Sequence, residues 1–137
     1  MKYPYLESEV NMRRPVVPFT ISYRNEKPVK YWGLLDSGAD HTLIDARLAN
    51  LIGIEDITTG KEESVEGIGG QSKVYFHPIT VNIGGWEFSI DAGFTTDLTL
   101  SSIGHGLLGQ IGLFDQSTIK FNRRKFEMEI VPTMIDA

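Results

Sequence analysis

The sequence predicts an all-β domain, mostly antiparallel, with one or two short helices. Two observations favour strands. The apolar runs are short, and 14 glycines among 137 residues supply the turns that would separate them. Apolar side chains also alternate with polar ones along 74–83 and again along 86–90, on either side of Gly84 and Gly85. This two-residue period is typical of an antiparallel hairpin with one buried face.

The composition is that of a globular protein and excludes several functions. With 41% hydrophobic and 23% charged residues, a chain of this length can bury its own core as one domain. The absence of cysteine excludes a disulfide framework and thiol chemistry. A net charge of −5 argues against a nucleic-acid surface. Because no apolar signal region precedes the domain and no apolar run approaches ~18 residues, we expect a cytoplasmic protein without a membrane partner.

The first half of the chain is interpreted as an arm followed by three strands. Residues 1–14 are polar, and we expect a loose or surface-laid arm ahead of a single domain, residues 15–137. β-Branched and aromatic residues predict strands over 16–23 and 29–35, and a short apolar strand follows at 42–44.

Two short helices are expected. One covers 45–52, with Asp45 as its N-cap and Gly53 as its stop. Three apolar residues would form its buried face: Leu48, Leu51 and Ile52. A second short helix is expected over 111–116.

The second half of the chain adds hairpins. A glycine-rich turn within 64–74 is either a mobile hairpin tip or an ordinary structural hairpin, and the glycines alone leave both open. An extended segment is expected over 94–100, and strands 117–121 and 126–131 form a final hairpin.

The stretch 34–40, Leu-Leu-Asp-Ser-Gly-Ala-Asp, holds the strongest candidate for chemistry. Its two leucines indicate the end of a buried strand, and Gly38 permits a tight turn. Asp36 is therefore a carboxylate carried from a buried strand into a turn, which costs free energy unless the group is hydrogen-bonded or paired. A carboxylate in such a place is often kept for its chemistry.

This stretch resembles the catalytic segment of the retropepsins, the retroviral-type aspartic proteases. Two later stretches agree in order and spacing: Gly67-Ile68-Gly69-Gly70 is similar to the flap tip of that family, and Leu107-Leu108-Gly109 to its second signature. Together they cover the span 16–131. The resemblance implies a closed, mostly antiparallel β barrel of the pepsin/retropepsin-like acid protease fold. It also implies an aspartic endopeptidase that needs no cofactor. The three histidines have no metal-ligand spacing either.

An aspartic protease needs two carboxylates that share one proton, because two carboxylates about 3 Å apart cannot both ionise. The chain has one convincing copy of the motif. The nearest second triplet, Asp91-Ala92-Gly93, lacks the hydroxyl and is interpreted as a surface or turn carboxylate. The second Asp36 must then come from a second copy of the chain. The resemblance implies the same arrangement, a homodimer acting on peptide or protein substrates.

The roles of the catalytic segment are carried over from the family by matching position. Asp36 would be the catalytic carboxylate, and the Ser37 hydroxyl would hydrogen-bond across the dimer to brace the pair. The Gly38 carbonyl would contact the substrate backbone. Ala39 and Asp40 would line the cleft as substrate-binding residues.

The other substrate-binding positions implied by the resemblance lie further along the chain. Four residues would close over the substrate as a mobile lid that excludes water: Gly67, Ile68, Gly69 and Gly70. Leu107 would line an apolar side-chain pocket, while Leu108 and Gly109 would support the catalytic loop.

Two positions depart from the viral pattern. Gln110 stands where viral members have an arginine, and Val17 stands before Pro18 where they have another. Because those arginines tie the viral dimer together, another contact must hold this one. The candidate is the hairpin 117–131, whose apolar residues alternate: Ile119, Phe121, Phe126, Met128 and Ile130. The alternative is that this hairpin only closes the core of its own subunit.

A second class of function remains open at this point. The chain could be a retropepsin-like binding or dimerisation module with little or no proteolytic turnover, because fold does not imply function. The intact triplet 36–38 and the glycine-rich segment 67–70 favour the enzyme.

Overall fold

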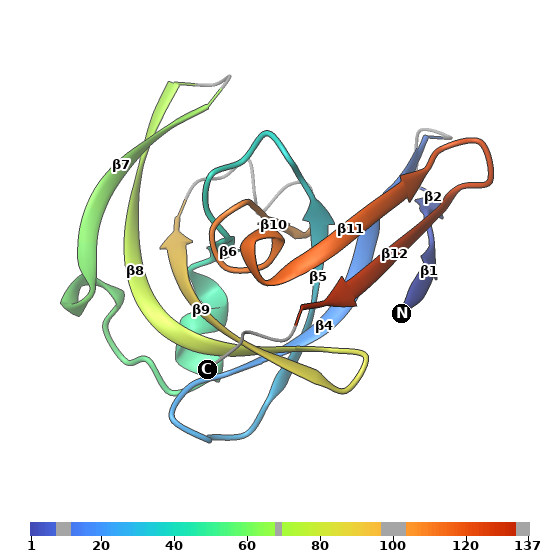
Figure 1. Cartoon of the computed structure of the whole chain (residues 1–137). Coiled ribbons are helices and arrows are strands. Elements are labelled where there is room, and N and C mark those ends of the chain that lie inside the picture. The colour runs from blue at the N-terminus through green and yellow to red at the C-terminus, as the bar shows by residue number, and fades with distance from the viewer. Residues whose placement is uncertain (8–11, 68–69, 97–103, 134–137) are drawn as a thin grey trace.

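The computed structural model describes residues 1–7, 12–67, 70–96 and 104–133, and these are mostly in strands (Figure 1). In chain order the elements are β1 (Lys2–Pro4), β2 (Leu6–Glu7), β3 (Arg13–Arg14), β4 (Val16–Ser22), β5 (Val29–Leu35), β6 (Leu43–Asp45), α1 (Arg47–Leu51), η1 (Ile57–Thr59), β7 (Lys61–Gly67), β8 (Gly70–Ile83), β9 (Trp86–Thr95), β10 (Gly106–Leu108), η2 (Phe114–Gln116), β11 (Ser117–Asn122) and β12 (Glu127–Pro132). The all-β prediction is confirmed. The expected strand over 94–100 is described only to residue 96, and the rest lies outside the described residues.

The main sheet closes on itself as a barrel. Its strand order is β4-β5-β10-β6-β9-β8-β7, and β4 also pairs with β8. Most neighbours are antiparallel, but β10 runs parallel to β5, and β6 runs parallel to β9. The barrel is therefore mixed, and both parallel pairs involve the strands that flank residues 36–42.

The core follows from the alternation seen in the sequence. In the β8–β9 hairpin, Ile79 pairs with Ile90 and Val81 pairs with Phe88, and all four side chains are buried. Removing one such side chain from water contributes roughly 1.5–3 kcal/mol. Because a slip of one residue would turn the whole set to solvent, this buried face fixes the register of the hairpin.

Helix α1 differs from the prediction at its start. The helix covers Arg47–Leu51, and its N-cap is Ala46. Asp45 instead ends β6, and its buried carboxylate accepts a hydrogen bond from the Arg47 backbone N–H at 2.9 Å. Leu51, expected on the buried face, is 63% exposed. A helix of five residues makes little more than one turn, so it cannot direct every apolar side chain inward.

The second expected helix, 111–116, is also shorter than predicted. Only the 3₁₀ turn η2, Phe114–Gln116, forms there. Gly112 has a φ of +114°, which lies outside the right-handed helical region, so helical geometry begins only after it. No helix among the described residues is long and apolar enough to span a membrane.

The N-terminal segment is laid on the final hairpin. β1 pairs with β12, which pairs with β11 on its other side. The guanidinium groups of Arg13 and Arg123 lie 4.5 and 4.3 Å from the centre of the Phe126 ring. The Tyr5 backbone N–H donates to the Phe126 carbonyl at 2.8 Å. Phe126 therefore holds the N-terminal segment at the turn of the hairpin.

The final hairpin turns its apolar face toward its own barrel. Met128 and Ile130 are buried in the core, and Ile119 packs against that core. Phe121 is 40% exposed. The side chains of Met128, Ile130 and Ile119 therefore close the chain's own core, and Phe121 on β11 stays exposed. The outer edge of β11, by contrast, has no partner strand among the described residues.

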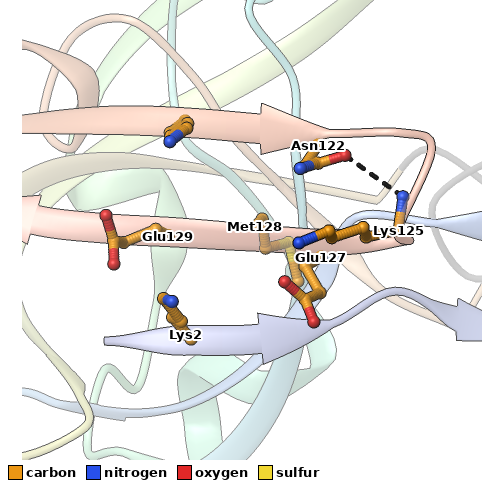
Figure 2. Close-up of a pocket in the computed structure, with 7 residues that line it drawn as sticks. Lys2, Asn122, Lys125, Glu127, Met128 and Glu129 are labelled. Atoms are coloured by element: carbon orange, nitrogen blue, oxygen red, sulfur yellow. Dashed lines mark hydrogen bonds between the residues drawn. The ribbon is translucent and has the colours of Figure 1, made fainter.

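The opposite face of the same sheet is charged. Lys2, Glu129 and Lys120 stand opposite one another on β1, β12 and β11. Figure 2 shows such side chains around a shallow hollow of about 160 Å³. Its lining residues are Lys2, Lys120, Asn122, Lys125, Glu127, Met128 and Glu129. Opposite charges on neighbouring strands stabilise a sheet by roughly 0.2–1 kcal/mol per pair, which gives this polar face a structural reason.

The burial of the hairpin predicts a contrast between two neighbouring residues. Ile130→Ala should lower the free energy of unfolding by roughly 2–5 kcal/mol, because it removes a fully buried side chain. Val131→Ala, at a position that is 46% exposed, should change it by no more than about 0.5 kcal/mol. Urea unfolding at one fixed protein concentration measures both. Equal losses would contradict the inward orientation of this face.

Candidate active site

Residues 36–42, which hold the candidate catalytic segment and are called the catalytic loop below for that reason, join β5 to β6. Strand β10 lies between these two strands. Leu107 stands beside Leu34 of β5 and beside Leu43 of β6, and Leu108 stands beside Leu35. The carbonyl of Leu108 accepts the Asp36 N–H at 3.0 Å. Residues 107–109, the predicted second signature, therefore support the loop through β10, which lies between the two strands that the loop connects.

The segment that follows β10 holds the far side of the loop. The Gln110 N–H donates to the Ala39 carbonyl and the Ile111 N–H to the Asp40 carbonyl, each at 2.8 Å. A Cβ at Gly109 would lie 2.6 Å from the Ala39 carbonyl oxygen and about as close to that of His41. Only glycine therefore lets this segment pass so near the loop.

The Asp36 carboxylate is half-buried and fixed by the turn that it begins. The Gly38 N–H donates to Asp36 Oδ1 at 2.9 Å, and the Ala39 N–H donates to the Asp36 carbonyl at 3.1 Å. An aspartate that starts a turn commonly accepts such a bond from the residue two positions on. The added Cβ of any larger residue at Gly38 would lie 3.3 Å from Oδ1 and crowd the carboxylate.

The remaining predicted residues of the segment lie on the same loop. Ser37, Gly38 and Asp40 are exposed, and Ala39 is half-buried. The structure thus brings together all five residues, 36–40, that the sequence assigned to catalysis and to the cleft. It places the Asp36 carboxylate among exposed neighbours, where a second molecule can reach it.

A row of three leucines lies beside the loop. Leu34, Leu107 and Leu43 are register partners on three adjacent strands, and each is half-buried. Their chain neighbours Leu35 and Leu108 are buried on the other face of the sheet. Leu107 was predicted to line the site, whereas Leu34 and Leu43 were not. The sequence around Asp36 does not show which leucines share a face, and the row is defined by the pairing of the three strands.

The predicted flap is a long hairpin. β7 and β8 pair as far as Gly67 and Gly70, so these two glycines frame its tip. Ile68 and Gly69, the other two predicted lid residues, lie outside the described residues. In Figure 1 the far ends of β7 and β8 and the loop after β5 lie at the same end of the barrel. The ring centres of His41 and Phe76 are 4.9 Å apart, which joins the catalytic loop to β8.

The other acidic candidates are accounted for elsewhere. Asp91 is exposed on β9, as its interpretation as a surface carboxylate predicted. Asp45 is buried and paired with Arg47, whose Nη2 lies 2.7 Å from Oδ2. Beside this pair, burial raises the pKa of Tyr31 to about 12. These contacts account for Asp45 and Asp91, and Asp36 remains the candidate catalytic carboxylate.

The histidines each have a structural contact. His41 packs on Phe76, His77 Nε2 lies 2.7 Å from the Ile57 carbonyl, and His105 Nδ1 lies 3.0 Å from the Gly106 carbonyl. Within the described ranges, no group of three or more histidine, aspartate or glutamate side chains could hold a metal ion.

The sequence was compared with known protein families. A family model described as "Aspartyl protease" matches residues 17–110. The chain belongs to this family. The match spans the catalytic loop, the β7–β8 hairpin and β10, which are the three segments on which the retropepsin-like prediction depended. That prediction is therefore confirmed.

Solved structures agree on the fold. The chain is similar to the EIAV protease complexed with the inhibitor HBY-793, with a TM-score of 0.52 over 77% of this chain and 88% of that one. The two sequences are 19% identical, so the likeness shows the retropepsin-like barrel and nothing finer. A comparison with curated proteins gave no match.

The burial of Tyr31 predicts a late step in alkaline titration. Burial raises its pKa to about 12, so the phenol stays protonated in the folded protein after an exposed tyrosine has ionised at pH ~10. The stability this phenol contributes is complete below the unfolded value and is lost as the pH rises toward 12. Absorbance at alkaline pH measures the step. Tyr31→Phe should reduce this late absorbance change, to which Tyr3 also contributes because burial raises its pKa too, and an unchanged late step would contradict the assignment.

Proposed function

We propose that the protein is an aspartic endopeptidase that hydrolyses peptide bonds with two Asp36 carboxylates, one from each subunit of a homodimer. The observation that carries this proposal is the presentation of Asp36. The carboxylate is half-buried, bonded by the Gly38 N–H, and held on a loop that β10 supports from within the sheet. A single chain supplies one such carboxylate, so the second comes from a second copy.

The chemistry follows from two carboxylates that share one proton. The ionised one takes a proton from a bound water, and the oxygen of that water attacks the scissile carbonyl carbon. The protonated one donates a hydrogen bond to the carbonyl oxygen as charge develops there. The tetrahedral intermediate then collapses, the carbon–nitrogen bond breaks, and the leaving amine takes a proton from the pair.

The neighbours of Asp36 have proposed roles in binding. The Ser37 hydroxyl braces the pair across the dimer, and the Gly38 carbonyl receives the substrate backbone. Ala39 and Asp40 line the cleft. These assignments are supported by exposure, because Ser37, Gly38 and Asp40 all face solvent on the loop.

The leucine row and the hairpin complete the proposed site. Leu107, with Leu34 and Leu43, offers an apolar wall, so we expect the enzyme to prefer large apolar side chains next to the cleaved bond. The tip of the β7–β8 hairpin, residues 67–70, closes over the peptide as a lid and excludes water.

The dimer is proposed to form along the edge of β11. An unpaired strand edge readily accepts another strand, and pairing with its own copy about a twofold axis makes the contact self-complementary. Phe121 on this strand is 40% exposed and is available to a partner. The viral arginine contact has no counterpart at Val17, whose side chain is fully buried.

The first test concerns the carboxylate. Asp36→Asn keeps an oxygen for the Gly38 N–H but cannot ionise, so turnover should fall at least ~10²–10⁴-fold with fold and dimer intact. The assay is cleavage of an unfolded protein at weakly acidic pH, with and without a statine-type peptide inhibitor. Asp91→Asn is the matched control, because it removes one exposed carboxylate from β9. Near wild-type turnover of Asp36→Asn would rule out the mechanism. A folded wild-type dimer without turnover would favour the binding-module alternative.

The second test concerns the subunits. Because one chain supplies half of the pair, activity should rise faster than linearly with protein concentration near the dissociation constant. Phe121→Lys, on the edge strand, should raise that dissociation constant in sedimentation experiments. Val131→Lys, equally exposed on the central strand β12, should not. A folded monomer that cleaves at the full rate would refute the requirement for two chains.

A further inference from the structure

The peptide group between Ser37 and Gly38 is held at both of its ends. Its carbonyl accepts a hydrogen bond from Gln110 Nε2 at 2.7 Å. Its N–H donates to Asp36 Oδ1 at 2.9 Å. One planar peptide unit therefore connects the side-chain amide of Gln110 to the candidate catalytic carboxylate.

We propose that Gln110 is a positioning residue for Asp36, acting through this peptide group. The inference rests on the proposed function and deepens it by naming what keeps the carboxylate oriented. Gln110 fixes the Ser37 carbonyl, and the rigid peptide then keeps the Gly38 N–H directed at Oδ1. Hydrogen bonds in such a chain also polarise one another, so the bond at the carboxylate is strengthened by the bond at Gln110.

The turn itself explains why this peptide needs a second anchor. The Ala39 N–H bonds to the Asp36 carbonyl, so residues 36–39 form a β-turn whose central peptide is the one between Ser37 and Gly38. A central peptide can rotate by about half a turn when glycine occupies the third position, because glycine tolerates the positive φ that results. That rotation would direct the N–H away from Asp36. The bond from Gln110 disfavours it.

Gln110 is well placed for this task. Its own N–H is bonded to the Ala39 carbonyl, and the next N–H along the chain is bonded to the Asp40 carbonyl. The backbone that carries the side chain is therefore fixed against the loop that the side chain holds. Its amide reaches a residue 73 positions away in the sequence, so the contact ties two segments that local structure alone would leave independent.

The bond from Gly38 favours the ionised carboxylate, because a hydrogen bond donated to a charged acceptor stabilises the charge. Weakening it should make the pair hold its proton to higher pH. The acidic limb of the pH–rate profile should then move upward. A residue that merely supported the fold would change the stability and leave this limb where it was.

The test compares the same substitution at two glutamines. Gln110→Met keeps the length of the side chain and removes the donor without adding charge. Gln116→Met is the control, because Gln116 Nε2 also donates to backbone carbonyls, those of Ser89 and Gly112, neither of which belongs to residues 36–42. For Gln110→Met we expect kcat to fall roughly 10- to 100-fold, the range seen when outer hydrogen-bond partners of a site are lost. KM should change little, and the acidic limb of the pH–rate profile should move to higher pH. Gln116→Met should retain the wild-type profile.

A second readout does not need turnover. The amide proton resonance of Gly38 should follow the protonation of Asp36 in an NMR titration, and Gln110→Met should shift its midpoint upward and speed its exchange with solvent. This arm separates the two proposals: a wild-type protein without peptidase activity would defeat the proposed function, while an unshifted Gly38 titration in Gln110→Met would defeat the role of Gln110. An equal shift in Gln116→Met would also overturn it.

Discussion

Strand β10 enters the sheet between β5 and β6, and its Leu108 carbonyl takes the N–H of Asp36. The position of the catalytic loop depends on this insertion. Without β10 the loop would cross an open gap between two strands that are not neighbours. With β10 in place, the loop lies against the backbone of the segment that follows β10. Gly109 lets that segment come close to the Ala39 and His41 carbonyls. The same insertion sets Leu107 between Leu34 and Leu43, so the support of the loop and the apolar wall beside it have one cause.

One aspartate follows or ends each of the two strands on either side of β10, and the two carboxylates have different surroundings. Asp45, at the end of β6, is held by the guanidinium of Arg47 on its two oxygens. A cation in that position favours the ionised form and would prevent a proton from being shared with another carboxylate. Asp36, after β5, receives its bond from a neutral N–H instead.

Patterns within short stretches of the sequence predicted the β8–β9 hairpin and the turn at Asp36, because both are formed by residues close together in the chain. The period of two along 74–90 gave the β8–β9 hairpin, because alternation alone decides which face is buried. The Asp-Ser-Gly triplet at 36–38 predicted the turn after β5, because aspartate and glycine are common turn residues. The barrel closure by β4 and β8, the leucine row, and the contact of Gln110 were not predictable in this way, because each joins segments far apart in the chain. The start of α1 was misplaced because Asp45 is still part of β6 and pairs with Thr95 of β9, a contact between segments far apart in the chain.

The pairing of β8 has a mechanical consequence. From Val74 onward this strand has β9 as a neighbour, whereas residues 70–73 pair only with β7 within the part of the chain that the structure describes. The outer part of the β7–β8 hairpin is thus a two-stranded ribbon. Along β8 it continues directly into residues that pair with β7 or β9 in the barrel. A two-stranded hairpin is only marginally stable by itself. Were the β7–β8 hairpin to close as the proposed lid, it would bend where the number of neighbouring strands changes, near Val74, and that bend would need no glycine hinge.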